Sequence, residues 1–271
     1  MKIFISVDME GIAGVVDEKD TLNDGKEYKA SRRLMTQETN AAIEGCLNAG
    51  ARKIIVADSH STTRNIIARN LNPEARLISG LPRPLGQMEG LDESFSGVFL
   101  LGYHSMNGTR NGVLDHSWSS NSIHFVKING KEIGEIGLNT MLANYYGVPV
   151  LLVSGCDKAI NEAKIYLDKA EFVVVKAGLG RTSVSSLHPE KAQNLIRKAS
   201  EKAVKNATDN ILQPEGPFKL EIMFKKSSMA EMTSLIPDVA RDSGRKVTYQ
   251  TNDFLQLFKV FRVLLFISCQ V

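Results

Sequence analysis

The sequence predicts an α/β protein with a mainly parallel sheet flanked by helices, followed by a smaller α+β C-terminal region. Short apolar runs rich in β-branched residues are typical of strands buried on both faces. Helical patterns lie between most of these runs, an alternation that predicts parallel pairing. The 271 residues are 43% hydrophobic and 23% charged, which is ordinary for a globular protein.

Five apolar runs are expected to form the strands of the parallel sheet, at 2–7, 53–57, 98–101, 148–154 and 172–175. Apolar residues at helical spacing predict helices at 28–49, 138–146 and 158–170. A tight hairpin is predicted at 125–133, because Asn129-Gly130 lies between two alternating runs.

A connector is predicted at 212–217, where two prolines and a glycine follow a helix expected at 189–210. We therefore divide the chain into a catalytic α/β domain at 1–211 and a small α+β region at 212–271 that packs on it or completes it. The second region is expected to contain strands at 218–224 and 246–251, a helix at 229–235 and a closing helix from Asp253.

Composition excludes several classes of protein. The net charge is only +3 and no block of Lys or Arg stands out, so we expect no nucleic-acid partner. The three cysteines are far apart and are expected to be reduced. The apolar N-terminal run is too short for a signal peptide, and the run at 261–267 is far below the roughly 20 residues of a membrane helix. We expect a cytoplasmic protein with no membrane contact.

Two carboxylates follow the first expected strand, Asp8 and Glu10. Strand alternation would point both the same way, at the edge of the sheet where α/β proteins bind ligands. Two acids there repel each other unless a proton or a cation lies between them. A helix cap beside a solvated glutamate is the plain alternative.

The next two expected strands each end near a histidine, His60 and His104. Either alone is more typical of a hydrogen-bonded structural residue, but two beside a carboxylate pair favour a zinc site. Asp58 is a candidate for orienting one of these rings. His116 lies in a loop just beyond and is a candidate general acid or base, whereas His124 and His188 are expected to be structural.

Glu135 lies between two glycines, and on spacing alone it would cap the next helix. Competing motifs are weak. Gly178-Leu179-Gly180-Arg181 is half of a dinucleotide fingerprint, and neither a phosphate-binding loop nor a Gly-x-Ser-x-Gly elbow is present. Nucleotide hydrolysis and serine hydrolysis are therefore disfavoured.

Four motifs resemble the zinc-dependent D-aminopeptidase family found beside bacterial dipeptide-transport genes, and the likeness covers nearly the whole chain. They are Ser-Val-Asp-Met-Glu-Gly at 6–11, Asp-Ser-His-Ser at 58–61, Gly-Tyr-His at 102–104 and Gly-Glu-Ile-Gly-Leu-Asn at 134–139. The chain departs from the family pattern at 107–111 and 118–122, near the expected substrate pocket.

The resemblance implies two zinc ions per subunit. It places Asp8 between both ions, Glu10 and His104 on one, and His60 and Glu135 on the other. It makes His116 a catalytic residue outside the metal shell. It also implies a homo-oligomer, since the family forms ring-shaped decamers that enclose their active sites.

The expected function is that of a metallo-aminopeptidase that uses metal-activated water to release N-terminal, D-type amino acids from short peptides or amino-acid amides. A metal-dependent amidase or deacylase acting on another small amide is the enzymatic alternative. A small-molecule binding protein on the same fold is the non-enzymatic one, and it would be expected to have lost a metal position.

Overall fold

The computed structural model describes residues 1–207, 211 and 213–271, and its larger part is a sheet in the order β3-β2-β1-β4-β7-β8-β9. All neighbours pair in parallel except β9, which runs antiparallel to β8. The predicted α/β fold class is confirmed. The strands are β1 (Lys2–Val7), β2 (Lys53–Asp58), β3 (Ala75–Ile78), β4 (Gly97–Tyr103), β7 (Val150–Cys156), β8 (Glu171–Gly180) and β9 (Ser183–Ser186).

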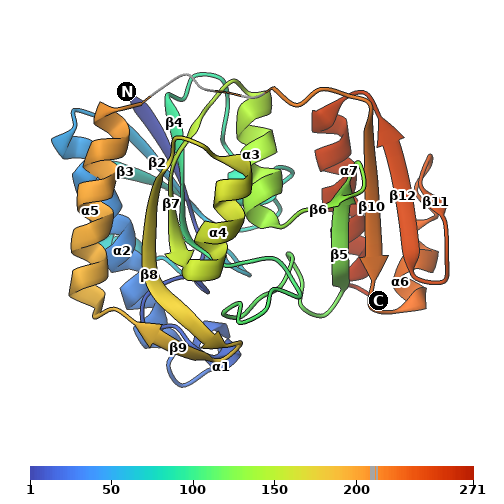
Figure 1. Cartoon of the computed structure of the whole chain (residues 1–271), viewed down its shortest axis with the longest axis horizontal. Coiled ribbons are helices and arrows are strands. Elements are labelled where there is room, and N and C mark those ends of the chain that lie inside the picture. Colours follow the sequence, from blue (N-terminus) through green and yellow to red (C-terminus); the bar gives the residue numbers. More distant parts are fainter. Residues whose placement is uncertain (208–210, 212) are drawn as a thin grey trace.

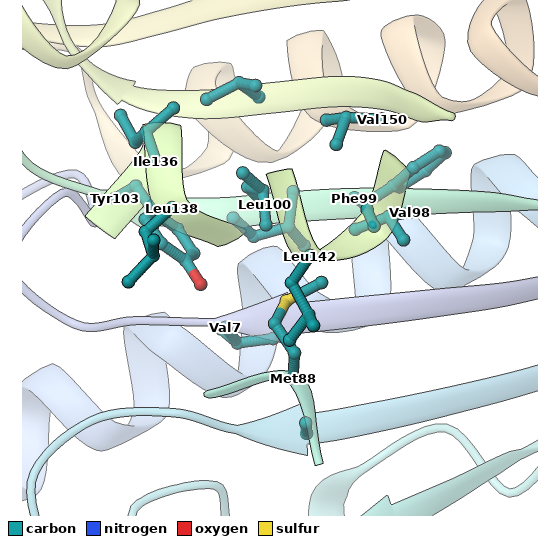
Figure 2. Packing of buried hydrophobic residues seen from close by; sticks show 14 of the residues in the cluster. Val7, Met88, Val98, Phe99, Leu100, Tyr103, Ile136, Leu138, Leu142 and Val150 are labelled. Carbon is teal, nitrogen blue, oxygen red and sulfur yellow. The ribbon is translucent and has the colours of Figure 1, made fainter. Parts of the chain in front are cut away.

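Helices cover both faces of this sheet (Figure 1). On one face α2 (Tyr28–Asn48) packs against α5 (Pro189–Lys205), and on the other α3 (Glu135–Tyr145) and α4 (Asp157–Tyr166) lie over β4, β7 and β8. Figure 2 shows Leu138 and Leu142 of α3 beside Val7, Leu100 and Met88. Three short helical turns complete this half: α1 (Glu18–Thr21), η1 (Ala68–Asn70) and η2 (Gly86–Met88).

A second, antiparallel sheet has the order β11-β12-β10-β5-β6. Its buried and partly buried residues alternate along β10, as expected for a sheet with one face on a core. Helix α7 packs on β10, β12 and α3, so it lies between the two halves of the molecule (Figure 1). The elements are β5 (Ile123–Ile128), β6 (Lys131–Glu132), β10 (Phe218–Phe224), α6 (Ser227–Thr233), β11 (Ala240–Arg241), β12 (Lys246–Thr251) and α7 (Phe254–Ser268).

The second sheet joins segments from both sides of the expected domain boundary at 211/212. The hairpin β5–β6 comes from the first region, and β5 pairs with β10 from the second, with Ile128 opposite Leu220. The division into 1–211 and 212–271 therefore stays a prediction. With this boundary, strands of both regions would belong to the same antiparallel sheet. The expected end of the helix at Asn210 and the start of the connector at Leu212 lie outside the described residues.

The carboxyl ends of β2, β1 and β4 lie side by side, because Val7 is opposite both Asp58 and Leu101. The loop after β1 packs closely on the end of β4, where Gly11 N donates to Gly102 O at 2.7 Å. A Cβ atom at Gly11 would lie 2.1 Å from Tyr103 O, so only glycine fits there. Within the described part of the chain, no helix is long and apolar enough to cross a membrane.

Glu38 of α2 is a buried acid beneath this loop. Its Oε1 accepts from Ala13 N at 2.9 Å, and burial raises its pKa to about 7. The folded protein therefore holds this proton more tightly than the unfolded chain does, so the contribution of Glu38 to stability falls as the pH rises from about 4.5 to about 7.

Replacing Glu38 by Gln is expected to stabilise the protein relative to wild type by about 1–3 kcal/mol more at pH 8 than at pH 5, because glutamine cannot ionise. Urea unfolding of both proteins at the two pH values measures this difference. Glu44→Gln, at a partly exposed position of the same helix, is the control and should show no such trend. An equal effect of Glu38→Gln at both pH values would contradict the assignment.

Candidate metal centre

Asp8 and Glu10 both turn toward His60 at the end of β2. His60 Nδ1 lies 3.2 Å from Asp8 Oδ1 and 3.0 Å from Glu10 Oε2, and all three side chains are buried. Asp8 and Glu10 do point the same way, as expected, but strand alternation is not the cause. The strand ends at Val7, and Glu10 lies in a turn closed by the bond from Ile12 N to Met9 O.

His104 and Glu135 complete the cluster from β4 and α3. His104 Nε2 lies 3.6 Å from Asp8 Oδ2 and 3.4 Å from Glu135 Oε1. Glu135 is the first residue of α3, and Gly134 is the N-cap. It therefore does not cap the helix, and its side chain faces the cluster instead.

The imidazoles of His60, His104 and His116 each have one nitrogen that faces a main-chain carbonyl and another that faces the cluster. His60 Nε2 lies 3.1 Å from Thr21 O, His104 Nδ1 lies 3.0 Å from Ser105 O, and His116 Nδ1 lies 2.9 Å from Leu114 O. The nitrogen beside a carbonyl must carry the proton, so a neutral ring presents a lone pair on the other side. Such contacts are how metal-binding histidines are oriented in general.

His116 stacks on His104, with ring centroids 4.0 Å apart and planes 12° apart. Its Nε2 lies 3.9 Å from Glu135 Oε1. Burial, together with the neighbouring His104, lowers the pKa of His116. The structure thus places His116 beside His104 and Glu135, with an imidazole that favours the neutral form.

The acids and imidazoles of this cluster shift one another's pKa values. Burial raises the pKa of Asp8 to about 7, and repulsion by Glu10 adds to the shift. Burial alone would raise the pKa of Glu135 as well, but His104 lowers it to about 2. Burial likewise opposes the shifts of Glu10 and His60, yet their mutual attraction lowers the pKa of the acid and raises that of the base.

The donor set fits zinc. Ligand atoms of Asp8, Glu10 and His104 lie within 4.8 Å of one another, and so do those of His104, His116 and Glu135. In the described part of the chain, His104 Nε2 is buried without a hydrogen-bond partner, although it faces two carboxylates. Imidazole and carboxylate together are typical zinc ligands.

Comparison with known proteins identifies the family. A family model described as peptidase M55, D-aminopeptidase, matches residues 1–263. The chain belongs to the M55 D-aminopeptidase family. This membership confirms the predicted resemblance and makes the chain a peptidase.

The sequence comparison and the structure comparison of this M55 chain both match a D-aminopeptidase of Bacillus subtilis. A D-aminopeptidase of strain 168 is 37% identical over 267 residues, which are 97% of this chain and 96% of the relative. The solved structure of DppA, described as a zinc-dependent D-aminopeptidase and a self-compartmentalizing protease, superposes with a TM-score of 0.95 at 35% identity. That match covers 100% of this chain and 99% of the other.

A buried chain of hydrogen bonds holds Glu135 in the M55 chain, and no sequence pattern predicted this network. Glu135 Oε2 accepts from Gln87, whose Oε1 accepts from Asn139 Nδ2 at 2.7 Å. Asn139 also donates to Tyr103 OH at 3.0 Å. On the other side, Trp118 N donates to Glu135 Oε1 at 2.6 Å. Gln87 comes from η2, a turn with no periodic pattern to reveal it.

Lys176 fixes the loop that carries Glu10. Its buried ammonium donates to the main-chain oxygens of Glu10 at 2.5 Å, Ile12 at 2.9 Å and Val15 at 2.5 Å. Burial lowers its pKa to about 8. A single lysine at the end of the apolar run 172–175 was the signal that could have revealed it.

Asp58 was a candidate for orienting a histidine ring, but the structure gives its carboxylate other partners. Its carboxylate accepts from Asn65 N, Asn65 Nδ2 and Ile66 N, and Asn65 Nδ2 also donates to His60 O. Asp58 therefore shapes the main chain after His60. His188 caps α5 by accepting from Glu190 N, which confirms its structural role.

Four of the five metal-binding candidates line a cavity of about 440 Å³: Asp8, Glu10, His60 and Glu135. His116 lines it too, whereas His104 does not. The loop 118–121 and the C-terminal half of α7 also contribute to the lining. This volume falls within the range of small-molecule sites.

Proposed function

We propose that this M55 chain is a zinc-dependent aminopeptidase with two metal ions per subunit, and that it releases N-terminal D-amino acids from short peptides or amino-acid amides. The supporting observation is that five donor side chains from four separate segments meet in one buried cluster beside a cavity. The description of the DppA structure as zinc-dependent supports the choice of metal.

In this proposal Asp8 would be a ligand of both ions. Its Oδ1 faces His60 and its Oδ2 faces His104, an arrangement that suits a bridging carboxylate. Glu10 and His104 would hold one ion, and His60 and Glu135 the other. A bound pair of zinc ions polarises a peptide carbonyl and lowers the pKa of water toward neutrality.

The protein's own contribution centres on His116. Its Nδ1 is held by Leu114 O, its Nε2 lies 3.9 Å from Glu135 Oε1, and the residue lines the cavity. A neutral imidazole there can accept a proton from the attacking water and pass it to the leaving nitrogen. Once protonated, Nε2 can also donate a hydrogen bond to the developing oxyanion. Trp118 N and Gln87 keep Glu135 in place during this exchange.

We also propose that the chain works as a homo-oligomer, in the form of a decameric ring. The proposal is supported by the description of DppA as self-compartmentalizing and by the coverage of both full chains in that match. Light scattering on the purified protein measures the subunit number, and a monomer would contradict the proposal.

Metal analysis combined with kinetics tests the proposed reaction. We expect about two zinc ions per chain, loss of hydrolysis after thorough chelation, and recovery when zinc is returned. D-alanine amide and L-alanine amide form a matched pair, and the D form is expected to be cleaved faster. Full activity after metal removal would contradict the mechanism, and equal rates would contradict the stereochemical preference.

A further inference from the structure

Arg262 of α7 is a charged side chain without a partner at the proposed active site. It lines the same cavity as Asp8, His116 and Glu135. Its Nε is buried and forms no hydrogen bond within 1–207, 211 and 213–271. Among the ion pairs of these residues, none brings a carboxylate within 4.0 Å of its guanidinium.

The main chain of η2 holds this guanidinium in position. A Cβ atom at Gly86 would lie 2.9 Å from both Cζ and Nε of Arg262, so the absence of a side chain at Gly86 makes room for the planar group. Gly86 adopts φ +58°, which also favours glycine. The next residue, Gln87, donates to Glu135. The guanidinium and the donor cluster are therefore held by consecutive residues.

The surrounding charges leave the guanidinium uncompensated. Burial lowers the pKa of Arg262, and repulsion by Arg83 lowers it further. Glu135 and Glu89 oppose this shift from a distance. The Glu89 carboxylate is already engaged by Leu85 N at 2.7 Å. A half-buried guanidinium whose Nε has no partner is costly, and a carboxylate that can accept two parallel N–H bonds is the group that best offsets this cost.

We propose that Arg262 binds the C-terminal carboxylate of a short peptide whose scissile bond lies at the donor cluster, which makes peptides with a free carboxylate better substrates than their amides. The assignment rests on the proposed aminopeptidase function. A short peptide has an amine at one end and a carboxylate at the other, and the lining of the cavity contains both the acids of the donor cluster and Arg262. The substrate class is thus di- and tripeptides with a free carboxyl end.

The test compares D-alanyl-glycine with D-alanyl-glycinamide, which share a scissile bond and differ only in the terminal charge. In the wild-type zinc enzyme, kcat/KM for the acid should exceed that for the amide by roughly 10- to 100-fold, as expected for a hydrogen-bonded charge pair. Arg262→Gln should bring this ratio close to one, and Arg262→Lys should retain part of it. Lys259→Gln, an exposed position on the same helix, should leave the ratio unchanged.

Binding of non-cleavable analogues separates this inference from the proposed function. In these analogues a methylene-amine replaces the scissile amide, again with an acid or an amide terminus, and calorimetry measures their Kd. The acid should bind at least tenfold more tightly to wild type but not to Arg262→Gln, even if neither parent peptide were cleaved. An acid-to-amide ratio that is the same in wild type and Arg262→Gln, in kinetics and in binding, would overturn the assignment. Failure to cleave either parent peptide would instead overturn the proposed function.

Discussion

Replacing His116 by Ala is expected to lower kcat by roughly 10²- to 10⁴-fold while the zinc content stays at the wild-type level. His116 lines the cavity, its ring stacks on His104, and in the proposal it is not a metal ligand. Its loss would remove a proton carrier and leave the five proposed ligands in place. Metal analysis and steady-state kinetics on the same protein sample measure the two effects.

Zinc content decides between this role and the rival one. His116 also forms a possible ligand group with His104 and Glu135. If it were a ligand, zinc would fall together with kcat in the alanine variant. His124→Ala is the matched control, because His124 lies exposed on β5 and should change neither quantity.

Much of the fold could be predicted because buried parallel strands leave a strong local pattern. The predicted range at 2–7 and the observed Lys2–Val7 are identical, and so are those at 218–224 and 246–251. The hairpin around Asn129 was also predictable, because its turn depends on two adjacent residues. Its partner was not, since the pairing of β5 with β10 joins segments about 90 residues apart and depends on tertiary packing.

The candidate site divides in the same way. Asp8, His60 and His104 follow strands that lie side by side, so their meeting could be predicted from the strand ends alone. Glu135 was assigned through the family resemblance, because its own spacing favoured a cap. Gln87 and Arg262 could not be predicted, since one comes from an irregular turn and the other from the cavity face of a helix in the second half of the chain.

The replacement of Asp8 by Asn is expected to affect function and stability in opposite directions. Asparagine has nearly the same shape, and its Oδ1 can still accept from Met9 N. It offers one oxygen where the proposed bridge needs two. We expect the variant to bind less than half of the wild-type zinc and to lose at least about 10³-fold in kcat/KM, since the metal supplies the nucleophile.

In zinc-free protein the same substitution is expected to be stabilising. Burial beside Glu10 and Glu135 raises the pKa of Asp8 to about 7, so the ionised form is held in the fold at a cost that a neutral amide avoids. The gain at pH 8 is on the order of 1–3 kcal/mol in the free energy of unfolding, after a discount for coupling within the cluster. Chemical denaturation with a chelator present measures it.

Adding zinc should then reverse the order of stability. Wild type gains by mass action, about 4 kcal/mol when free zinc is 1,000 times its Kd, whereas Asp8→Asn gains far less. The exposed Asp168→Asn serves as the control and should follow wild type in both conditions. A variant of Asp8 that zinc stabilises as strongly as wild type would show that the buried acids do not hold the metal. The crossing of the two stability orders therefore tests directly whether this cluster of like charges is maintained for a cation.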